Sequence, residues 1–247
     1  KEKEEDIEVM NDNDEEEILN IPTLSISKKE KINKRYKTEI TLNVDKEEKY
    51  MLRNLACGMK EYELEAYFDF NCKIKGATDL AFTTIAAAGK NATTLHYVEN
   101  NSKLKDGDLI LFDLGAEYNC YNADITRTFP ISGKFTERQK EVYNSVLKVN
   151  EEIINLIKPG MKYKDINEKA TDLIAEECIK LGLIKDKSEV RKYYYHSIGH
   201  SLGMDTHDIE TPHRDIIFEP GVVFTVEPGI YIQEEGIGIR IEEFLWD

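Results

Sequence analysis

The stretch DLGAEYNCYNADITRTFP, from Asp113 to Pro130, places two carboxylates in a segment that otherwise reads as a β-hairpin. Folding it about Tyr118 and Asn119 brings Asp113 opposite Asp124, with both side chains on one face of the ladder. Like charges directly opposite each other are unfavourable unless a positive group lies between them. The stretch therefore predicts a bound cation at this hairpin.

A second stretch, TVEPGIYIQEEGIGIRIEE, repeats the pattern near the end of the sequence. Folding it about Glu234 and Glu235 places Glu227 opposite Glu242, although Pro228 distorts the ladder nearby. For any single strand, the ordinary interpretation is an antiparallel sheet with one solvated face. Four carboxylates in two mirrored pairs favour a binding site instead.

Histidines supply the nitrogen donors for such a site: His96 lies in TTLHYVENN, and His196, His200 and His207 lie in YHSIGHSLGMDTHD. Taken alone, each imidazole is more often a packed or surface group than a ligand. His196 and His200 have the spacing of a helical zinc pair, but the glutamate of HExxH is absent and Gly199 weakens a helix, which argues against a zincin. Carboxylates with one histidine favour Mn²⁺. Four carboxylates neutralise two such ions and leave a bridging hydroxide as the nucleophile.

Composition excludes several classes of protein. The 247 residues allow one sizeable α/β domain, alone or with a small appendage. A net charge of −15 without a basic face argues against nucleic-acid binding. The four cysteines lack CxxC spacing, so neither a zinc knuckle nor a disulfide framework is indicated. No signal peptide or membrane-spanning stretch is recognisable, and we expect a cytoplasmic protein that does not bind membranes.

Two regions are expected along the chain. Residues 1–17 are almost wholly charged or amide, and residues 18–44 form a unit too small for its own core, so we interpret 1–44 as an acidic linker and the remnant of an N-terminal domain. The catalytic domain is expected over 45–247. Its predicted helices cover 45–55, 60–68, 136–157 and 163–182. Its predicted strands cover 81–89, 109–118, 123–129, 222–232 and 237–246.

Six motifs follow one another in a specific order: LHY (95–97), DLGAEYNCYNADITRTFP, KPGM (158–161), HSIGHSLGMDTHD, EPGVVFTVEPGIYI and GIRIEE. In this combination the chain resembles the pita-bread metallopeptidases of the Xaa-Pro aminopeptidase (aminopeptidase P) and prolidase group. The resemblance implies an α+β pita-bread (creatinase/aminopeptidase) fold, in which a curved antiparallel sheet carries helices on its outer face.

The resemblance also implies a ligand set for two divalent metal ions, expected to be Mn²⁺. The ligands carried over are Asp113, Asp124, His200, Glu227 and Glu242. Asp124 and Glu242 would bridge the ions, Asp113 would complete one site, and His200 with Glu227 would complete the other. This is the same set that the two hairpins and the histidine motif indicate.

Five residues are implied to take part in catalysis. Glu227 would handle the proton of the attacking hydroxide. His96, His196 and His207 would orient the scissile carbonyl and stabilise the tetrahedral oxyanion. Arg240 would steady the bridging carboxylates.

The implied reaction is hydrolysis of the N-terminal Xaa-Pro bond of peptides with proline at the second position, and we expect a homo-oligomer, a dimer. The alternatives are a prolidase, which cleaves Xaa-Pro dipeptides, and a metal-free pita-bread binding module. Creatinase-like amidinohydrolases and methionine aminopeptidases match the motifs less well. A dipeptidase needs a cation for the proline carboxylate. The loop over 208–221 offers only His213 and Arg214 for this purpose, which favours the aminopeptidase.

Overall fold

The computed structural model describes residues 55–208 and 216–245. Its helices are α2 (Glu61–Ile74), α3 (Glu137–Leu156) and α4 (Tyr163–Lys180), with 3₁₀ segments η2 (Gly89–Thr93) and η3 (Lys187–Lys192). Its strands are β1 (Asp79–Leu80), β2 (Ile85–Ala88), β3 (Leu109–Leu114), β4 (Ala116–Tyr118), β5 (Tyr121–Asn122), β6 (Ile125–Pro130), β7 (Phe224–Val226), β8 (Gly229–Ile232), β9 (Ile237–Arg240) and β10 (Glu243–Leu245). The paired strands are all antiparallel.

A helix or strand lies in each predicted range that the structure describes, but α2 extends to Ile74, and the predicted strands over 109–118, 222–232 and 237–246 are each divided into two. The predicted helix over 45–55 and the domain boundary at residue 45 lie outside the described residues, apart from residue 55 itself. None of the helices in the described ranges is long and apolar enough to span a membrane.

The first hairpin differs from the prediction in its register. Asp113 pairs with Thr126, not with Asp124. The turn residues are Asn119 and Cys120, whose φ angles are 52° and 66°. Two successive positive φ angles are the backbone of a two-residue type I′ turn, so the turn chemistry moves the fold point by one residue and the partners by two. Because side chains alternate with period two, Asp124 still shares a face with Asp113.

The predicted register of the second hairpin is confirmed. Gly229 lies opposite Arg240 in the β8–β9 ladder, and the β7–β10 ladder continues in the same register. Glu227 and Glu242 occupy the break between these ladders, at positions opposite each other. The interruption at Pro228 leaves both carboxylates at the edge of regular pairing.

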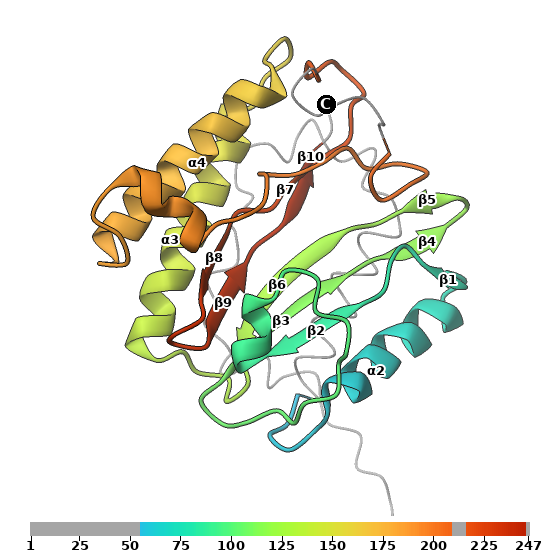
Figure 1. Cartoon of the computed structure of the whole chain (residues 1–247). Coiled ribbons are helices and arrows are strands. Elements are labelled where there is room, and N and C mark those ends of the chain that lie inside the picture. The colour runs from blue at the N-terminus through green and yellow to red at the C-terminus, as the bar shows by residue number, and fades with distance from the viewer. Residues whose placement is uncertain (1–54, 209–215, 246–247) are drawn as a thin grey trace, which may run out of the picture. The chain divides into compact units, whose positions relative to one another are not determined.

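The two hairpins meet where β6 lies beside β9 and β10 (Figure 1). The Glu242 N–H donates to the Thr126 carbonyl at 3.0 Å. The Thr128 hydroxyl donates to the Arg240 carbonyl at 3.0 Å and accepts from its N–H at 3.2 Å. These bonds bring the acidic residues of the two hairpins into one region.

The helices flank this strand layer. Figure 1 shows α2 beside β2 and the α3–α4 pair beside β8 and β9. An extensive apolar core lies between the α3–α4 pair and the second hairpin and includes Val142, Val146, Ile174, Ile230 and Ile239. The apolar stripes of the two helices and the inner face of β8 and β9 therefore support the acidic region from one side.

One backbone arrangement introduces both α2 and α4. The sequence Gly-Met-Lys precedes each helix, at 58–60 and 160–162, with glycine φ angles of 95° and 88°. Each lysine is an extended N-cap. The glycine N–H donates to Leu104 at 2.9 Å in the first case and to Phe218 at 2.7 Å in the second. The first residues of α2 and α4 are therefore structurally equivalent.

Candidate metal centre

Three of the predicted ligands form a buried cluster where the hairpins meet. The ligand atoms of Asp124, His200 and Glu242 all lie within 4.8 Å of one another. His200 Nε2 lies 3.3 Å from Asp124 Oδ2 and 3.6 Å from Glu227 Oε1. Residues from both hairpins and from the segment before β7 thus converge on one point.

The backbone around His200 fixes which of its ring nitrogens faces the cluster. Its Nδ1 lies 3.0 Å from the Ser201 carbonyl, and because a carbonyl only accepts, Nδ1 carries the hydrogen. In the neutral ring, Nε2 is then the nitrogen with the lone pair and the one available as a metal ligand. The His200 N–H donates to Thr225 Oγ1 at 3.0 Å. Gly199 is not helical, as predicted, and a Cβ there would lie 1.9 Å from the Thr225 carbonyl oxygen.

Arg240 links Asp113 to the rest of the cluster. Its side chain is buried, with Nη2 donating to Asp113 Oδ2 and Nε donating to Thr126 Oγ1 at 3.1 Å. The Thr126 hydroxyl in turn donates to Glu242 Oε2 at 2.7 Å. Arg240 thereby holds Asp113 directly and Glu242 through a hydroxyl.

Two residues of this network were missed in the sequence, Thr126 and Tyr231. The Tyr231 hydroxyl accepts from Arg240 Nη1 at 3.1 Å. Both could have been found by alternation, since Thr126 is two residues from Asp124, and Tyr231 is four residues from Glu227, on the same strand faces. Hydroxyl residues are common in strands, however, and do not stand out as acids do.

The electrostatics of the cluster disfavour four ionised carboxylates. Burial, followed by the Asp113 and Glu227 carboxylates, raises the pKa of Asp124 well above its usual value. Burial and Asp124 likewise raise the pKa of Glu242. Burial also raises the pKa of Glu227, against the opposing effect of His200. This repulsion is what a bound cation relieves.

The polar atoms of the cluster fit a divalent metal. Asp113 Oδ1 and Glu242 Oε1 are buried acceptors without a hydrogen-bond partner among the described residues. Unpaired buried acceptors are costly, and a cation would satisfy both. Carboxylate oxygens with one imidazole nitrogen suit hard or borderline divalent ions.

The other predicted histidines surround this cluster. His196 has Nδ1 2.7 Å from the Ser197 carbonyl and Nε2 2.8 Å from the Tyr231 hydroxyl. Burial, with Arg240 nearby, lowers its pKa to about 3, so the ring is neutral. The ring centroid of His207 lies 4.2 Å from that of His200. His96 is exposed but close enough to His196 to lower the pKa of His196 further.

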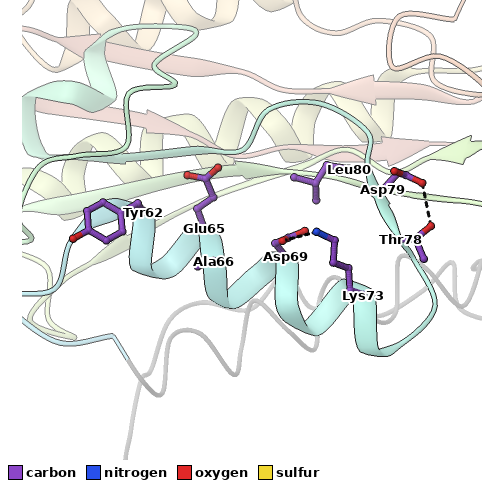
Figure 2. Close-up of a pocket in the computed structure, with 8 residues that line it drawn as sticks. All are labelled: Tyr62, Glu65, Ala66, Asp69, Lys73, Thr78, Asp79 and Leu80. Carbon is purple, nitrogen blue, oxygen red and sulfur yellow. Dashed lines mark hydrogen bonds and ion pairs between the residues drawn. The ribbon is translucent and has the colours of Figure 1, made fainter.

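A separate pocket along α2 contains none of the predicted site residues (Figure 2). It is lined by Tyr62, Glu65, Ala66, Asp69, Lys73, Thr78, Asp79 and Leu80. Its charges are paired within the protein, since Lys73 contacts Asp69 at 2.8 Å and Thr78 donates to Asp79 at 3.0 Å. We assign no ligand to it.

Residues 40–246 match the family description "metallopeptidase family M24". The chain belongs to metallopeptidase family M24. This membership implies divalent metal ions, in agreement with the fit of the cluster. The loop residues His213 and Arg214, which were used to choose between two M24 activities, lie outside the described residues.

Similar proteins include Xaa-Pro aminopeptidase 3 of Dictyostelium discoideum, 46% identical over 196 residues, which cover 75% of this M24 chain and 38% of that protein. A solved Bacillus anthracis structure is 48% identical with a TM-score of 0.82, covering 84% of this chain and 49% of that one. Aminopeptidase P from Escherichia coli, in its low-pH form, is 38% identical with a TM-score of 0.77, covering 83% and 50%. The M24 chain has the predicted α+β pita-bread fold and spans half the length of these relatives or less.

Proposed function

We propose that this M24 chain is the catalytic part of a metal-dependent aminopeptidase that hydrolyses the N-terminal Xaa-Pro bond of peptides. The observation that carries the proposal is the buried cluster of Asp124, His200 and Glu242, whose ligand atoms lie within 4.8 Å of one another. The substrate class is taken from the Xaa-Pro aminopeptidases to which the chain is similar. A homodimer and a cytoplasmic location are part of the same proposal.

The five acidic and imidazole ligands would hold two divalent ions, proposed to be Mn²⁺. Asp124 and Glu242 would be shared, Asp113 would complete one position, and His200 with Glu227 would complete the other. When bound, the ions would neutralise the carboxylates and lower the pKa of water, so that a nucleophile exists at neutral pH.

Glu227 would move the proton in this reaction. Its carboxylate lies beside His200 and accepts from the Thr225 hydroxyl at 3.4 Å. An Xaa-Pro bond is a tertiary amide, and its nitrogen carries no hydrogen. This nitrogen must gain a proton to leave as an amine. Glu227 would take this proton from the attacking water and deliver it to the proline nitrogen.

The histidines would divide between substrate contact and support. Both ring nitrogens of His196 are engaged, one by the Ser197 carbonyl and one by the Tyr231 hydroxyl. His196 would therefore position Tyr231 and, through it, Arg240. The exposed rings of His96 and His207 would orient the scissile carbonyl and stabilise the oxyanion.

Hydrolysis of matched peptides tests the proposal. We expect the chelator-treated protein to recover cleavage of Xaa-Pro-Xaa-Xaa on addition of Mn²⁺, and to leave Xaa-Ala-Xaa-Xaa uncut. Glu242→Gln removes a buried ligand and should abolish cleavage. Glu235→Gln changes an acid in the same hairpin that pairs with Arg138 at 2.8 Å instead, and should leave cleavage unchanged.

Two outcomes would replace the proposal. Faster cleavage of Xaa-Pro than of Xaa-Pro-Xaa-Xaa would indicate a prolidase. Absence of Mn²⁺ binding, together with no hydrolysis of either peptide, would indicate a metal-free binding module.

A further inference from the structure

Glu61 is a fully buried carboxylate at the first position of α2. Its Oε1 accepts from the Ala88 N–H at 2.7 Å and from Asn91 Nδ2 at 2.9 Å. Its Oε2 accepts from the Tyr97 hydroxyl at 2.8 Å and from the Ser102 N–H at 2.8 Å. Burying a carboxylate is unfavourable in free energy unless hydrogen bonds satisfy its oxygens. Here four neutral donors satisfy them.

All four donors belong to one segment, residues 88–102, which carries His96. Ala88 and Ser102 are its two ends, and Tyr97 is the residue after His96. A single side chain of α2 thus ties both ends and the middle of the segment together. Ala88 is the last residue of β2 and pairs with Ile110 of β3. The rest of the segment contains no strand and only the short η2 turn, so no regular ladder holds it.

A second acid of α2 supports the same segment. Asn100 is buried and donates from Nδ2 to Glu65 Oε2 at 2.9 Å and to the Thr84 carbonyl at 2.8 Å. Glu65 is one helical turn from Glu61. Figure 2 shows the Glu65 carboxylate directed toward the strands, unlike that of Asp69 next to it on the helix, which pairs with Lys73.

The equivalent residue of α4 makes the equivalent contact. Tyr163 is the first residue of α4, as Glu61 is of α2, and follows the same Gly-Met-Lys lead-in. Its hydroxyl donates to the Gly199 carbonyl at 3.2 Å, directly before His200. In both copies of the arrangement, the first helical residue therefore holds a segment that bears a site histidine.

Residues 88–102 also contact the segment that bears His196. The Tyr195 hydroxyl donates to the Thr93 carbonyl at 2.5 Å. The Tyr97 ring packs in a cluster with Tyr231, whose hydroxyl contacts His196. A shift of the Glu61-bound segment would therefore move His96 relative to the rest of the site.

We propose that Glu61 is a positioning residue, which holds residues 88–102 so that His96 is fixed for the reaction. This role rests on the proposed function, because His96 has a catalytic part only there. The holding of the segment itself does not depend on that function and can be measured separately.

Glu61→Gln keeps the size of the side chain but replaces one acceptor with a donor. We expect amide hydrogen exchange over 88–102 to become about 10- to 100-fold faster, with α3 and α4 unchanged. His96 ring resonances, assigned with His96→Gln, should shift. With unchanged Mn²⁺ content, kcat on Xaa-Pro-Xaa-Xaa should fall about 10- to 100-fold, with KM changing less.

Glu177→Gln is the matched control. Glu177 is a buried carboxylate of α4 that accepts from Ser145 at 3.2 Å and from Lys148 at 2.7 Å. Its partners are on helices and not on a histidine segment, so stability should fall without a change in kcat. If Glu61→Gln does not fold, Tyr97→Phe removes one of the four donors and should give a smaller change in the same direction.

Unchanged exchange over 88–102, or an equal fall in kcat in Glu61→Gln and Glu177→Gln, would overturn the proposal. Faster exchange with unaltered kcat would do so as well. If the unmodified protein binds Mn²⁺ but cleaves no Xaa-Pro peptide, the proposed function fails independently of the role of Glu61. Amide hydrogen exchange over 88–102 and the His96 ring resonances still decide whether Glu61 holds the segment.

Discussion

At the scale of single residues, Arg240 carries a positive charge among four acidic side chains. Removing one partner from a buried ion pair leaves an uncompensated charge. Arg240→Met should lower the free energy of unfolding of the chelator-treated protein by about 3 kcal/mol, measured by urea denaturation. Saturating Mn²⁺ should recover part of this loss, because the ions supply the missing positive charge.

Arg138→Met is the control for that measurement. Arg138 pairs with Glu235 at the surface, where an ion pair contributes at most about 1 kcal/mol. Equal losses in the two variants would show that the position of Arg240 among the carboxylates has no special effect.

His196 predicts a dependence of stability on pH. The charged and titratable groups that act on it are Tyr231, Arg240, Arg191 and His96. Burial lowers its pKa to about 3, whereas an unfolded histidine titrates near 6.5. Between these values the unfolded chain binds a proton that the folded chain does not, so stability falls as the pH falls. His196→Gln removes this contribution.

The measurement is urea unfolding at pH 7.5 and pH 5 in the presence of chelator. The unmodified protein should lose about 2 kcal/mol more than His196→Gln over this interval. Parallel losses in the two proteins would mean that His196 can accept a proton in the folded state.

Charge makes the acids and histidines of the candidate site conspicuous in the sequence. Paired acids and a cluster of histidines pointed to Asp124, His200 and Glu242, which the structure brings together. Thr126 was missed because a strand threonine has an ordinary explanation as a β-forming residue. The role of its hydroxyl depends on Arg240, which lies 114 positions away.

At the scale of elements, turn chemistry decided which register was predicted correctly. The first fold point was assigned to Tyr118 and Asn119, but the two positive φ angles fall at Asn119 and Cys120. Asn is favoured in such a turn, but Cys is not, so the sequence lacks the usual Asn-Gly signal. Helices were easier to predict: Thr136 is the N-cap of α3, and its hydroxyl and the Gln139 side chain form a capping box.

This turn gives a prediction for the hairpin. Cys120 has a φ of 66°, which costs energy for any residue with a Cβ. Cys120→Gly should raise the free energy of unfolding by roughly 0.5–1 kcal/mol, measured by thermal or urea unfolding. Cys120→Ala, which also removes the thiol but keeps the Cβ, should give no gain. A similar gain in both variants would attribute the effect to the thiol.

At the scale of the whole molecule, the proposed ligands come from both hairpins, so metal binding should stabilise the assembled fold. At a free Mn²⁺ concentration of 100 times the dissociation constant, the gain should be about 2.7 kcal/mol for each bound ion. Calorimetry over a Mn²⁺ titration measures it as a rise in Tm. In Asp124→Asn the rise should be much smaller, and an undiminished rise there would place the ions elsewhere.

The pairing of distant segments was the part of the fold that local patterns could not supply. Hydrophobic periodicity predicts elements one at a time. Periodicity does not show that β6 lies beside β9, or that Glu61 contacts the segment before β3. The repeated Gly-Met-Lys at 58–60 and 160–162 was the available signal that α2 and α4 are introduced in the same way. It is short enough to be overlooked.

The meeting of β6 with β9 and β10 also bears on how quickly the protein reaches its native state. Thr126 and Glu242 are 116 positions apart, and Asp113 and Arg240 are 127 apart. Closing such long loops costs entropy before any contact is gained, and domains rich in distant contacts fold slowly. Neither hairpin alone contains the full set of proposed ligands. High affinity for the metal should therefore arise late on the folding pathway, when the two hairpins dock.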